Sequence, residues 1–586
     1  QTPNPKPQTP NPKTQPLKGY FYLNIIITNH FKKSIYSRKL FYKMWKVQLL
    51  GTLLGIVLLT VEYSNFYVTL GDKFVRKDSP IMFRVGYMVK GSKGNHFPLY
   101  ANKIRLMTPQ GKIFDFPVGT CRNYFYNGSP ATNKEQRYYE LRKEQGRLKG
   151  DPLLERYFEE TGESIAKYEK IENEKKLNPK SKPKVNSILN YYRNFCFHDL
   201  LIENLEIFSY WLINEKGEQL TRIFQFKSKI AITDKPRVAI LGDHDLDATG
   251  IHVLEQMKNN ELDLIIFLGD LAYELTDFNG LKGDYYFEIM EELISKVPFV
   301  MTPGNHEIHN DFHMIAARFY VPGGLLFDSI SLFSFSMNNW LFVLYNFSPA
   351  VYEQRIGFHS AIQQIDEHLE ARKKEFNPEW IFFVSHLPFY CSLLSEHSKP
   401  ECFDNGIFIK PFEDILHYHN VNFRIGGHVH GYERMSHVYG LEKQQDSDKG
   451  TIVIGNGCAS SHHLDEKLKM FPFNYSEKIL LKTSGFSIFN QDNQGQIVYK
   501  HIDELGLEVD SKIYFKESKF VSFKKWFSSN KLVCFIILLF LITIIGIGIW
   551  RIKRIIKNSK ISKQRIKKYI GNSSSPSDTT IILDNS

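Results

Sequence analysis

A chain of 586 residues is too long for one typical hydrophobic core, which predicts two folded domains with appended segments. Its formal net charge of +11 would suit a nucleic-acid-binding protein, but the basic excess is confined to the two ends. Residues 1–46 carry +9 and residues 551–586 carry +7, so the residues between them carry −5. A mildly acidic body argues against a nucleic-acid partner, and its basic ends are expected to concern membranes.

The N-terminal end begins with a short proline-rich repeat, QTPNPKPQTPNPKTQP, that cannot bury apolar surface. We therefore predict no folded structure for residues 1–43. Met44 precedes an apolar stretch at residues 47–61, which has the length of a signal-peptide core. Residues 44–64 are predicted as a signal peptide, and an uncleaved signal anchor stays open because no small-x-small pattern precedes Asn65.

Residues 65–233 have the pattern of an all-β domain. Short alternating runs separated by turn residues predict an antiparallel β-sandwich. These runs are FYVTL, IMFRVGYMV, KIRLM, KIFDFPV, LEIFSYWLI and RIFQFKS. A segment rich in Lys, Glu, Arg and Tyr, at about residues 133–184, is predicted to be a charged helical or disordered insertion. Cys121 and Cys196 could form a disulfide within this domain.

Residues 236–505 change to an α/β pattern, in which apolar runs alternate with amphipathic stretches. The apolar runs are RVAIL, LDLIIFL, VPFVM, WLFVLYN, EWIFFV, VNFRI and TIVIG, and the amphipathic stretches include DYYFEIMEELISK and HSAIQQIDEHLEARKK. Nearly continuous apolar strands predict sheets that are buried on both faces, with helices outside. Cys391 and Cys402 are close enough in sequence to form a local disulfide.

Five loops that follow these strands are rich in Asp, Asn and His. They read LGDHD, LGDLAY, PGNHE, VSHLP and GGHVHGYER, and they offer Asp243, Asp270, Tyr273, Asn305, His386, His428 and His430. Each residue alone has an ordinary structural explanation, such as a turn or a core histidine. Strand ends converge in α/β folds, so together these side chains predict a site for two metal ions with Asp270 as the bridging ligand.

These loops resemble the metallophosphoesterase superfamily, and GDLAY, GNHE, SHLPFYC and GHVHGYER closely resemble the purple acid phosphatases. FSYWLINEKGEQLTRIFQFKS is similar to the end of that family's fibronectin-like domain, and IGNGCASSH is similar to its late glycine-rich loop. The resemblance covers about residues 65–505. It implies a four-layer αββα catalytic domain preceded by a fibronectin III-like domain.

The resemblance also implies how the metals are bound. The first metal takes Asp243, Asp270, Tyr273 and His430, and the second takes Asp270, Asn305, His386 and His428. Many metallophosphoesterases have Asp-x-His in the first loop, whereas this chain has Asp243-His244-Asp245, so Tyr273 would supply the missing ligand. A phenolate favours Fe(III), with Fe, Zn or Mn as the divalent partner. Asp245 or Asp247 could crowd the first metal or act in its outer shell.

The implied activity is that of an acid phosphatase, which hydrolyses phosphate monoesters. His306 resembles the substrate-contacting histidine of the family and would protonate the leaving group, a role that His397 or His309 could share. A phosphodiesterase or nucleotide pyrophosphatase with the same metals stays open. A catalytically inactive membrane receptor or adhesion protein is the alternative from another class. A homodimer is also possible.

The C-terminal end is predicted to anchor the protein. A linker at residues 506–531 precedes residues 532–550, which have no charge and the length of a membrane-spanning helix. The basic tail that follows, residues 551–586, predicts a cytoplasmic tail and a single-pass type I arrangement at the cell surface or in endolysosomes. DTTIIL in this tail resembles a dileucine sorting signal. The predicted glycosylation sites, Asn127, Asn346 and Asn474, precede the span.

Overall fold

The computed structural model describes part of the chain, namely residues 62–70, 74–75, 81–90, 103–117, 120–126, 191–202, 207–230, 233, 235–308, 312–319, 332–347, 357–394, 406–440, 442–444, 450–460, 469–470, 474–515 and 531–570. The first of its two compact units, Gln1–Val61, lies outside the described residues. The predicted unstructured end at 1–43, most of the signal segment 44–64 and the insertion at 133–184 therefore lie outside them too. Strand β1 begins at Glu62, three residues before the predicted start of the β domain.

Sheet A, the larger of the two main sheets, has ten strands. In spatial order these are β25 (Glu508–Tyr514), β24 (Ile497–Asp503), β23 (Gly485–Gln491), β10 (Val238–Leu241), β11 (Leu264–Phe267), β12 (Phe299–Met301), β1 (Glu62–Leu70), β3 (Ile81–Lys90), β7 (Tyr191–Ile202) and β6 (Thr120–Tyr126). The central strands β10, β11 and β12 are parallel, and every residue in them is buried. Their continuous apolar runs follow from burial on both faces.

Sheet B has nine strands. Eight follow one path, β19 (Glu442–Lys443), β18 (Tyr432–Tyr439), β20 (Thr451–Asn456), β17 (Phe423–Gly426), β15 (Trp380–Ser385), β14 (Trp340–Tyr345), β13 (Leu332–Met337) and β2 (Phe74–Val75), and β22 (Ser476–Leu480) pairs with β18. Strands β14, β15, β17 and β20 are parallel. All seven apolar runs predicted as strands of the α/β region are therefore found in the two sheets.

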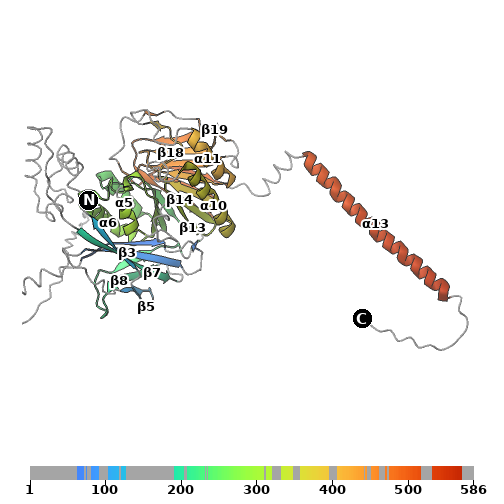
Figure 1. The fold of residues 1–586 in the computed structure, drawn as a ribbon, viewed down its shortest axis with the longest axis horizontal. Helices are drawn as coiled ribbons and strands as arrows, with labels where there is room; N and C mark the ends of the chain where they lie inside the picture. The colour runs from blue at the N-terminus through green and yellow to red at the C-terminus, as the bar shows by residue number, and fades with distance from the viewer. Residues whose placement is uncertain are drawn as a thin grey trace, which may run out of the picture. The chain divides into compact units, whose positions relative to one another are not determined.

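Helices cover one face of each sheet, and the other faces meet. Ile265 and Phe267 of β11 pack against α5 (Ala248–Asn259) and α6 (Leu281–Ile294). Ile381 and Phe383 of β15 pack against α10 (Phe358–Phe376) and α11 (Gly406–Tyr418), which lie together in Figure 1. Phe382 points the opposite way, and its ring centroid lies 5.4 Å from that of Phe489 in β23. The alternation along each strand gives the order helix, sheet, sheet, helix.

The N-terminal β region forms two antiparallel layers, as predicted. One consists of β1, β3, β7 and β6, and the other of β5 (Ile113–Phe116), β4 (Lys103–Met107), β8 (Ile207–Ile213) and β9 (Phe224–Lys227). Phe66 and Phe224 join the layers, with ring centroids 4.4 Å apart. A disulfide between Cys121 and Cys196 links β6 to β7, which confirms the predicted bond.

The boundary between the two predicted domains is less sharp than expected. Thr69 of β1 pairs with Phe299 of β12, so one layer of the N-terminal region continues the catalytic sheet. Tyr210 Oη also donates to the carbonyl oxygen of Ser295 at 2.7 Å. Residue periodicity reports which face of a strand is buried but not which distant strand it pairs with, so the sequence could not show this continuity. The fibronectin III-like character of this region stays a prediction.

The predicted linker at residues 506–531 is wrong in its first part, because Glu508–Tyr514 forms β25 at the edge of sheet A. Edge strands carry charged and exposed residues, so the sequence of β25 could not be distinguished from that of a linker. Helix α13 (Lys531–Ile570) follows and contains the predicted membrane span. In the described part of the chain, no helix has an apolar stretch long enough to cross a membrane.

Candidate metal centre

The seven predicted ligand residues lie at the carboxyl ends of parallel strands. Asp243 follows β10, Asp270 and Tyr273 follow β11, Asn305 follows β12, His386 follows β15, and His428 and His430 follow β17. The two sheets are tied at this end by His386, whose Nδ1 lies 2.8 Å from the carbonyl oxygen of Leu268. The fold therefore brings all seven residues to one place, as the strand pattern predicted.

A first group of side chains surrounds Asp243. Tyr273 Oη lies 3.1 Å from Asp243 Oδ1 and 3.0 Å from His430 Nε2. His430 Nε2 is itself 3.4 Å from Asp243 Oδ1. The backbone N–H of His428 donates to the other oxygen, Asp243 Oδ2, at 2.8 Å. A carboxylate, a phenol and an imidazole therefore converge on one point.

A second group surrounds His386. Its Nε2 lies 3.2 Å from Asp270 Oδ2, 3.0 Å from Asn305 Oδ1 and 3.2 Å from His428 Nδ1. The ligand atoms that Asp270, His386 and His428 offer all lie within 4.8 Å of one another. Apart from Asp270, the residues of each group are those that the family resemblance assigned to one metal, and their ligand roles stay a prediction. Asp270 lies with the second group, and its bridging role stays a prediction.

The backbone is held in an unusual conformation at four of these residues. Asp243, Asp270, Tyr273 and His428 have positive φ angles of 59°, 54°, 40° and 66°. Each such non-glycine residue costs about 1–3 kcal/mol and persists only where its surroundings fix it. Strain concentrated in one set of loops is typical of a functional site.

Two glycines make room for the carboxylates. A Cβ atom at Gly304 would lie 2.1 Å from Asp270 Oδ1, and one at Gly427 would lie 2.6 Å from Asp243 Oδ2. Both distances are well below van der Waals contact, so any side chain at either position would displace a carboxylate. The glycines of PGNHE and GGHVH are therefore required by the close approach of backbone and carboxylate.

Burial and neighbouring charges shift the pKa of several ionisable groups in the site. Burial would raise the pKa of Asp270, but His386 lowers it below the usual range. Burial lowers the pKa of His386, but Asp270 outweighs this effect and raises it to about 9. Burial and the Asp243 carboxylate raise the pKa of the Tyr273 hydroxyl well above its ordinary value. Burial and the neighbouring His386 lower the pKa of His428 to about 4.

This donor set fits transition-metal ions. Carboxylate, imidazole, amide and phenol groups are the oxygen and nitrogen donors that iron, zinc and manganese accept in proteins. Asp243, Asp270 and His386 are all at most 2% exposed, so these groups are withheld from bulk water. Acceptor atoms that converge in a buried site repel one another unless protons or a cation lie between them. The arrangement can therefore hold metal, and the ligand roles stay a proposal.

His306 lies beside the two groups without joining either. Its Nδ1 is 3.0 Å from Glu274 Oε1, and its Nε2 is 3.9 Å from Asp270 Oδ2. Burial lowers the pKa of His306, but the hydrogen bond to Glu274 and the charge of Asp270 give a net rise. Its side chain is 32% exposed, so solvent or a substrate can reach it. His397 and His309, the other candidate acids, lie outside the described residues.

The two additional carboxylates of the first loop do not join the ligand groups. Asp247 caps helix α5 by accepting the N–H of Gly250 at 2.6 Å. Asp245 Oδ1 lies 3.9 Å from Lys282 Nζ, and Lys282 Nζ donates to the carbonyl oxygen of Tyr273 at 3.1 Å. Of the two alternatives for this loop, the structure favours an outer position for Asp245 over crowding of the first metal.

The sequence did not identify Glu274 and Glu307, which both contact the site. Glu274 orients His306, and Glu307 accepts three backbone N–H groups from the ligand loops. Glu307 stands two residues after Asn305 in PGNHE, and this position was the only signal for it. The contacts of a buried carboxylate depend on how loops that are distant in sequence pack together. The sequence therefore could not assign a role to either residue.

The predicted glycosylation sites have different surroundings. Asn346 is only 1% exposed, so it cannot carry a glycan in the folded chain, and this prediction is wrong. The Asn-x-Ser/Thr motif does not indicate whether its asparagine is exposed, which explains the error. Asn474 is exposed in a turn before β22, and Asn127 lies outside the described residues.

The second predicted disulfide falls partly outside the described residues. Cys391 is disulfide-bonded, and its predicted partner Cys402 lies outside them.

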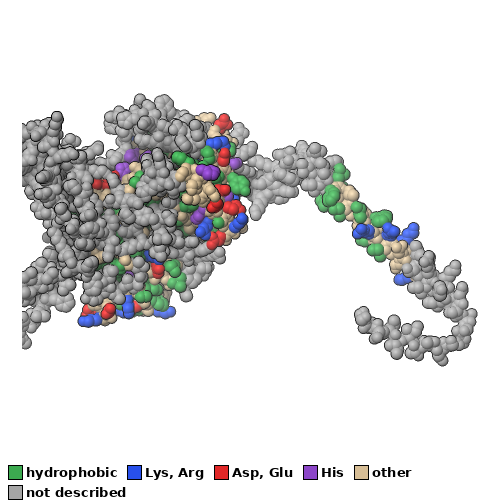
Figure 2. All heavy atoms as spheres, viewed as in Figure 1, with side chains coloured by type: hydrophobic (Ala, Val, Ile, Leu, Met, Phe, Trp, Pro, Cys, Tyr) green, Lys and Arg blue, Asp and Glu red, His purple; other side chains and the backbone are tan. Residues whose placement is uncertain are grey.

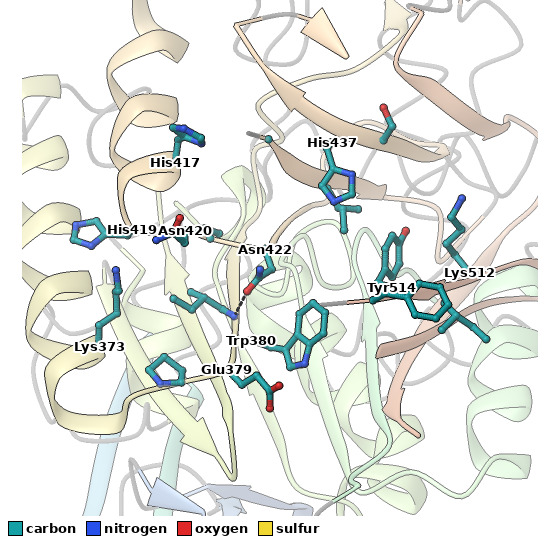
Figure 3. A pocket seen from close by; sticks show the side chains of 18 of the residues that line it. Lys373, Glu379, Trp380, His417, His419, Asn420, Asn422, His437, Lys512 and Tyr514 are labelled. Atoms are coloured by element: carbon teal, nitrogen blue, oxygen red, sulfur yellow. Dashed lines mark hydrogen bonds between the residues drawn. The ribbon is translucent and has the colours of Figure 1, made fainter. Parts of the chain in front are cut away.

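A cavity of about 630 Å³ lies at the opposite ends of the sheet B strands (Figure 3). Trp380, the first residue of β15, lines it, whereas His386 follows the last residue of that strand. The labelled Trp380 lies between Lys373 and Lys512 in this view. Lys512 is 3.5 Å from Glu477, so one of the lining charges is already paired. The cavity contains none of the seven residues, and it is separate from the candidate metal centre.

Comparison with known proteins agrees with this geometry. Residues 236–432, which include all seven residues, match the family model described as calcineurin-like phosphoesterase. Acid phosphatase type 7 of Mus musculus is 26% identical over 317 residues, covering 50% of this chain and 69% of that protein. Purple acid phosphatase 15 of Arabidopsis thaliana is 25% identical over 308 residues, covering 46% of this chain and 55% of that protein.

A solved structure shows the same fold. The purple acid phosphatase PPD1 from seeds of yellow lupin (Lupinus luteus) superposes with a TM-score of 0.54, at 15% identity. The superposition covers 78% of this chain and 74% of that chain.

Proposed function

We propose, on the premise that this chain is a purple acid phosphatase of the metallophosphoesterase superfamily, that it hydrolyses phosphate monoesters at a centre of two metal ions. The convergence of the seven strand-end residues into two groups, four of them buried and three half-buried, carries this proposal. A binding scaffold without catalysis has no chemical need for seven such donors, which disfavours an inactive receptor.

The donor types suggest which metals bind. Asp243, Tyr273 and His430 would hold Fe(III), because a phenolate is a hard anionic donor. Asp270, Asn305, His386 and His428 would hold a divalent Fe, Zn or Mn ion, with Asp270 shared between the two. When bound, such ions neutralise phosphoryl oxygens and lower the pKa of water, which supplies a hydroxide nucleophile.

The chain's own residues would position and protonate the substrate. His306 stands at the exposed edge of the site with its ring fixed by Glu274, so its Nε2 faces the second group. Protonated there, it would donate to the oxygen of the departing alcohol as the phosphorus–oxygen bond breaks. Glu274 accepts from the other ring nitrogen and thereby fixes which nitrogen carries the transferable proton.

A paired assay tests the proposal. We expect the purified protein to hydrolyse p-nitrophenyl phosphate at pH 5 much faster than bis(p-nitrophenyl) phosphate. A chelator should abolish this activity, and iron added with zinc should restore it, because the residues alone supply no nucleophile. Faster hydrolysis of the diester would favour the phosphodiesterase alternative. Activity that survives complete metal removal would contradict the metal centre.

We base the proposed cellular location on the sequence and on the exposed side chains of helix α13. The uncharged residues 532–550 support a single-pass type I arrangement, and the side chains described from Leu539 to Trp550 are mostly exposed. Figure 2 shows apolar side chains in one part of α13 and Lys and Arg side chains farther along it. We expect the full chain to stay in the pellet after carbonate extraction of membranes, and a chain ending at residue 530 to be released. Release of the full chain would contradict the anchor. A homodimer stays a prediction.

A further inference from the structure

Glu307 joins the two loops that carry Asp270 and Asn305. Its Oε2 accepts the N–H groups of Asp270 at 2.9 Å and Gly304 at 2.7 Å, and its Oε1 accepts that of Leu271 at 2.8 Å. We propose that Glu307 is a positioning residue, which fixes Asp270 relative to Asn305 so that both can reach one metal ion. This inference rests on the proposed function only in naming the metal.

The three hydrogen bonds of Glu307, here called the Glu307 clamp, hold together two loops whose backbones are constrained. Gly269 and Gly304 approach so closely that a Cβ at Gly269 would lie 2.3 Å from Gly304 N. Asp270 adopts a positive φ of 54°, which a non-glycine residue keeps only under constraint. Glu307 accepts the backbone N–H groups of Asp270 and Leu271, which lie before and after the Cα atom of Asp270. Relaxation of this backbone would turn the Asp270 carboxylate away from His386.

The carboxylate of Glu307 binds backbone of the two ligand loops, and through the N–H of Gly304 it also caps the turn Asn305–Glu307. Glu307 is 5% exposed, and no Lys or Arg of the described chain forms an ion pair with it. Its three hydrogen bonds are all to backbone N–H groups of the two ligand loops. A buried carboxylate that is compensated by three N–H groups is stable only while those groups stay in place. The clamp and the loop geometry therefore depend on each other.

Glutamine cannot replace this residue. A carboxylate offers two acceptor oxygens, whereas an amide offers one oxygen and one NH₂ donor. If the amide oxygen takes the place of Oε2, the NH₂ group faces the N–H of Leu271. If the amide is turned, the NH₂ group faces the N–H groups of Asp270 and Gly304. Either way at least one buried donor meets another donor and loses its hydrogen bond.

Glu413 offers a matched control elsewhere in the fold. It is 1% exposed and accepts the N–H of Gly440 at 2.8 Å, and its other oxygen accepts from Tyr390 and lies 3.6 Å from Nη1 of the buried Arg424. It contacts none of the seven ligand residues that the structure describes. Glu413→Gln should therefore disturb a buried carboxylate, together with its ion pair to Arg424, while every hydrogen bond of Glu307 to the Asp270 and Asn305 loops is kept.

The test compares Glu307→Gln, Glu307→Asp and Glu413→Gln in the full chain. Zinc binding by titration should weaken about 10- to 100-fold in Glu307→Gln, as for other outer-shell changes, and stay unchanged in Glu413→Gln. Glu307→Asp keeps the charge but is one methylene shorter, so it should weaken binding to a smaller extent. Wild-type zinc affinity in Glu307→Gln would overturn the proposal.

A second readout needs no metal, and it separates this inference from the proposed function. Amide hydrogen exchange of the metal-free protein should show lost protection at Asp270, Leu271 and Gly304 in Glu307→Gln. Glu413→Gln should lose protection at Gly440 instead. If the wild type binds no zinc, the proposed function fails while the exchange result still decides on the clamp. Unchanged protection at all three N–H groups would overturn it.

Discussion

His306→Ala is expected to lower kcat for poor leaving groups by about 10²- to 10⁴-fold, the usual contribution of general acid catalysis. The imidazole stands beside both groups of ligand residues without belonging to either, and Glu274 orients it. Its loss should therefore leave both metal ions bound. Steady-state kinetics with a series of phosphate monoesters, together with metal analysis of the variant, measures the two parts of this result.

The leaving group distinguishes the role of His306 from mere substrate contact. A nitrophenolate leaves without a proton, so its ester should lose less activity than an alkyl phosphate. His252→Ala, which removes an exposed imidazole from helix α5, is the matched control and should change neither ester. Equal losses for alkyl and nitrophenyl esters would refute the acid role and leave His306 as a phosphate contact.

Tyr273→Phe is expected to remove the visible absorption of the iron-loaded protein and to weaken its hold on ferric iron. The phenol lies 3.1 Å from Asp243 Oδ1 and 3.0 Å from His430 Nε2, which places it among the groups that would bind the first ion. A phenolate bound to Fe(III) transfers charge to the metal and gives a purple or pink colour. Substitution removes the hydroxyl alone, so the ring packing should survive.

Tyr286→Phe is the control for the loss of a buried hydroxyl. Its Oη lies 2.8 Å from His244 Nδ1, and the residue is fully buried in the core beside the site. This variant should keep both the colour and the iron, although it also loses a buried phenol. The idea of a phenolate ligand fails if the two variants have the same spectrum.

The sequence predicted the parts of the fold that depend on local pattern. The apolar runs RVAIL and LDLIIFL became β10 and β11, because strands buried on both faces carry no polar positions. The edge strand β25 was mistaken for linker, since only Tyr514 of its seven residues is buried. Pairing of Thr69 with Phe299 also escaped prediction, because it joins segments 230 residues apart whose patterns do not identify a partner.

The sequence likewise identified some residues of the candidate site and not others. The seven candidate ligand residues could be brought together from the sequence because each follows an apolar strand and carries a donor suited to metal. The roles of Asp247 and Asp245 could not be predicted, because one caps a helix and the other faces Lys282 from a distant element. Glu307 was overlooked because its partners are backbone N–H groups, which every residue but proline offers and which sequence therefore does not mark.

Metal analysis and a visible spectrum of one wild-type sample test whether the seven residues hold an Fe(III) ion beside a divalent ion. We expect about two metal ions per chain, at least one of them iron, together with a visible band. Removal of the iron should remove both the band and the phosphatase activity. An active, metal-replete sample that is colourless would contradict the Tyr273 ligand and the ferric site with it.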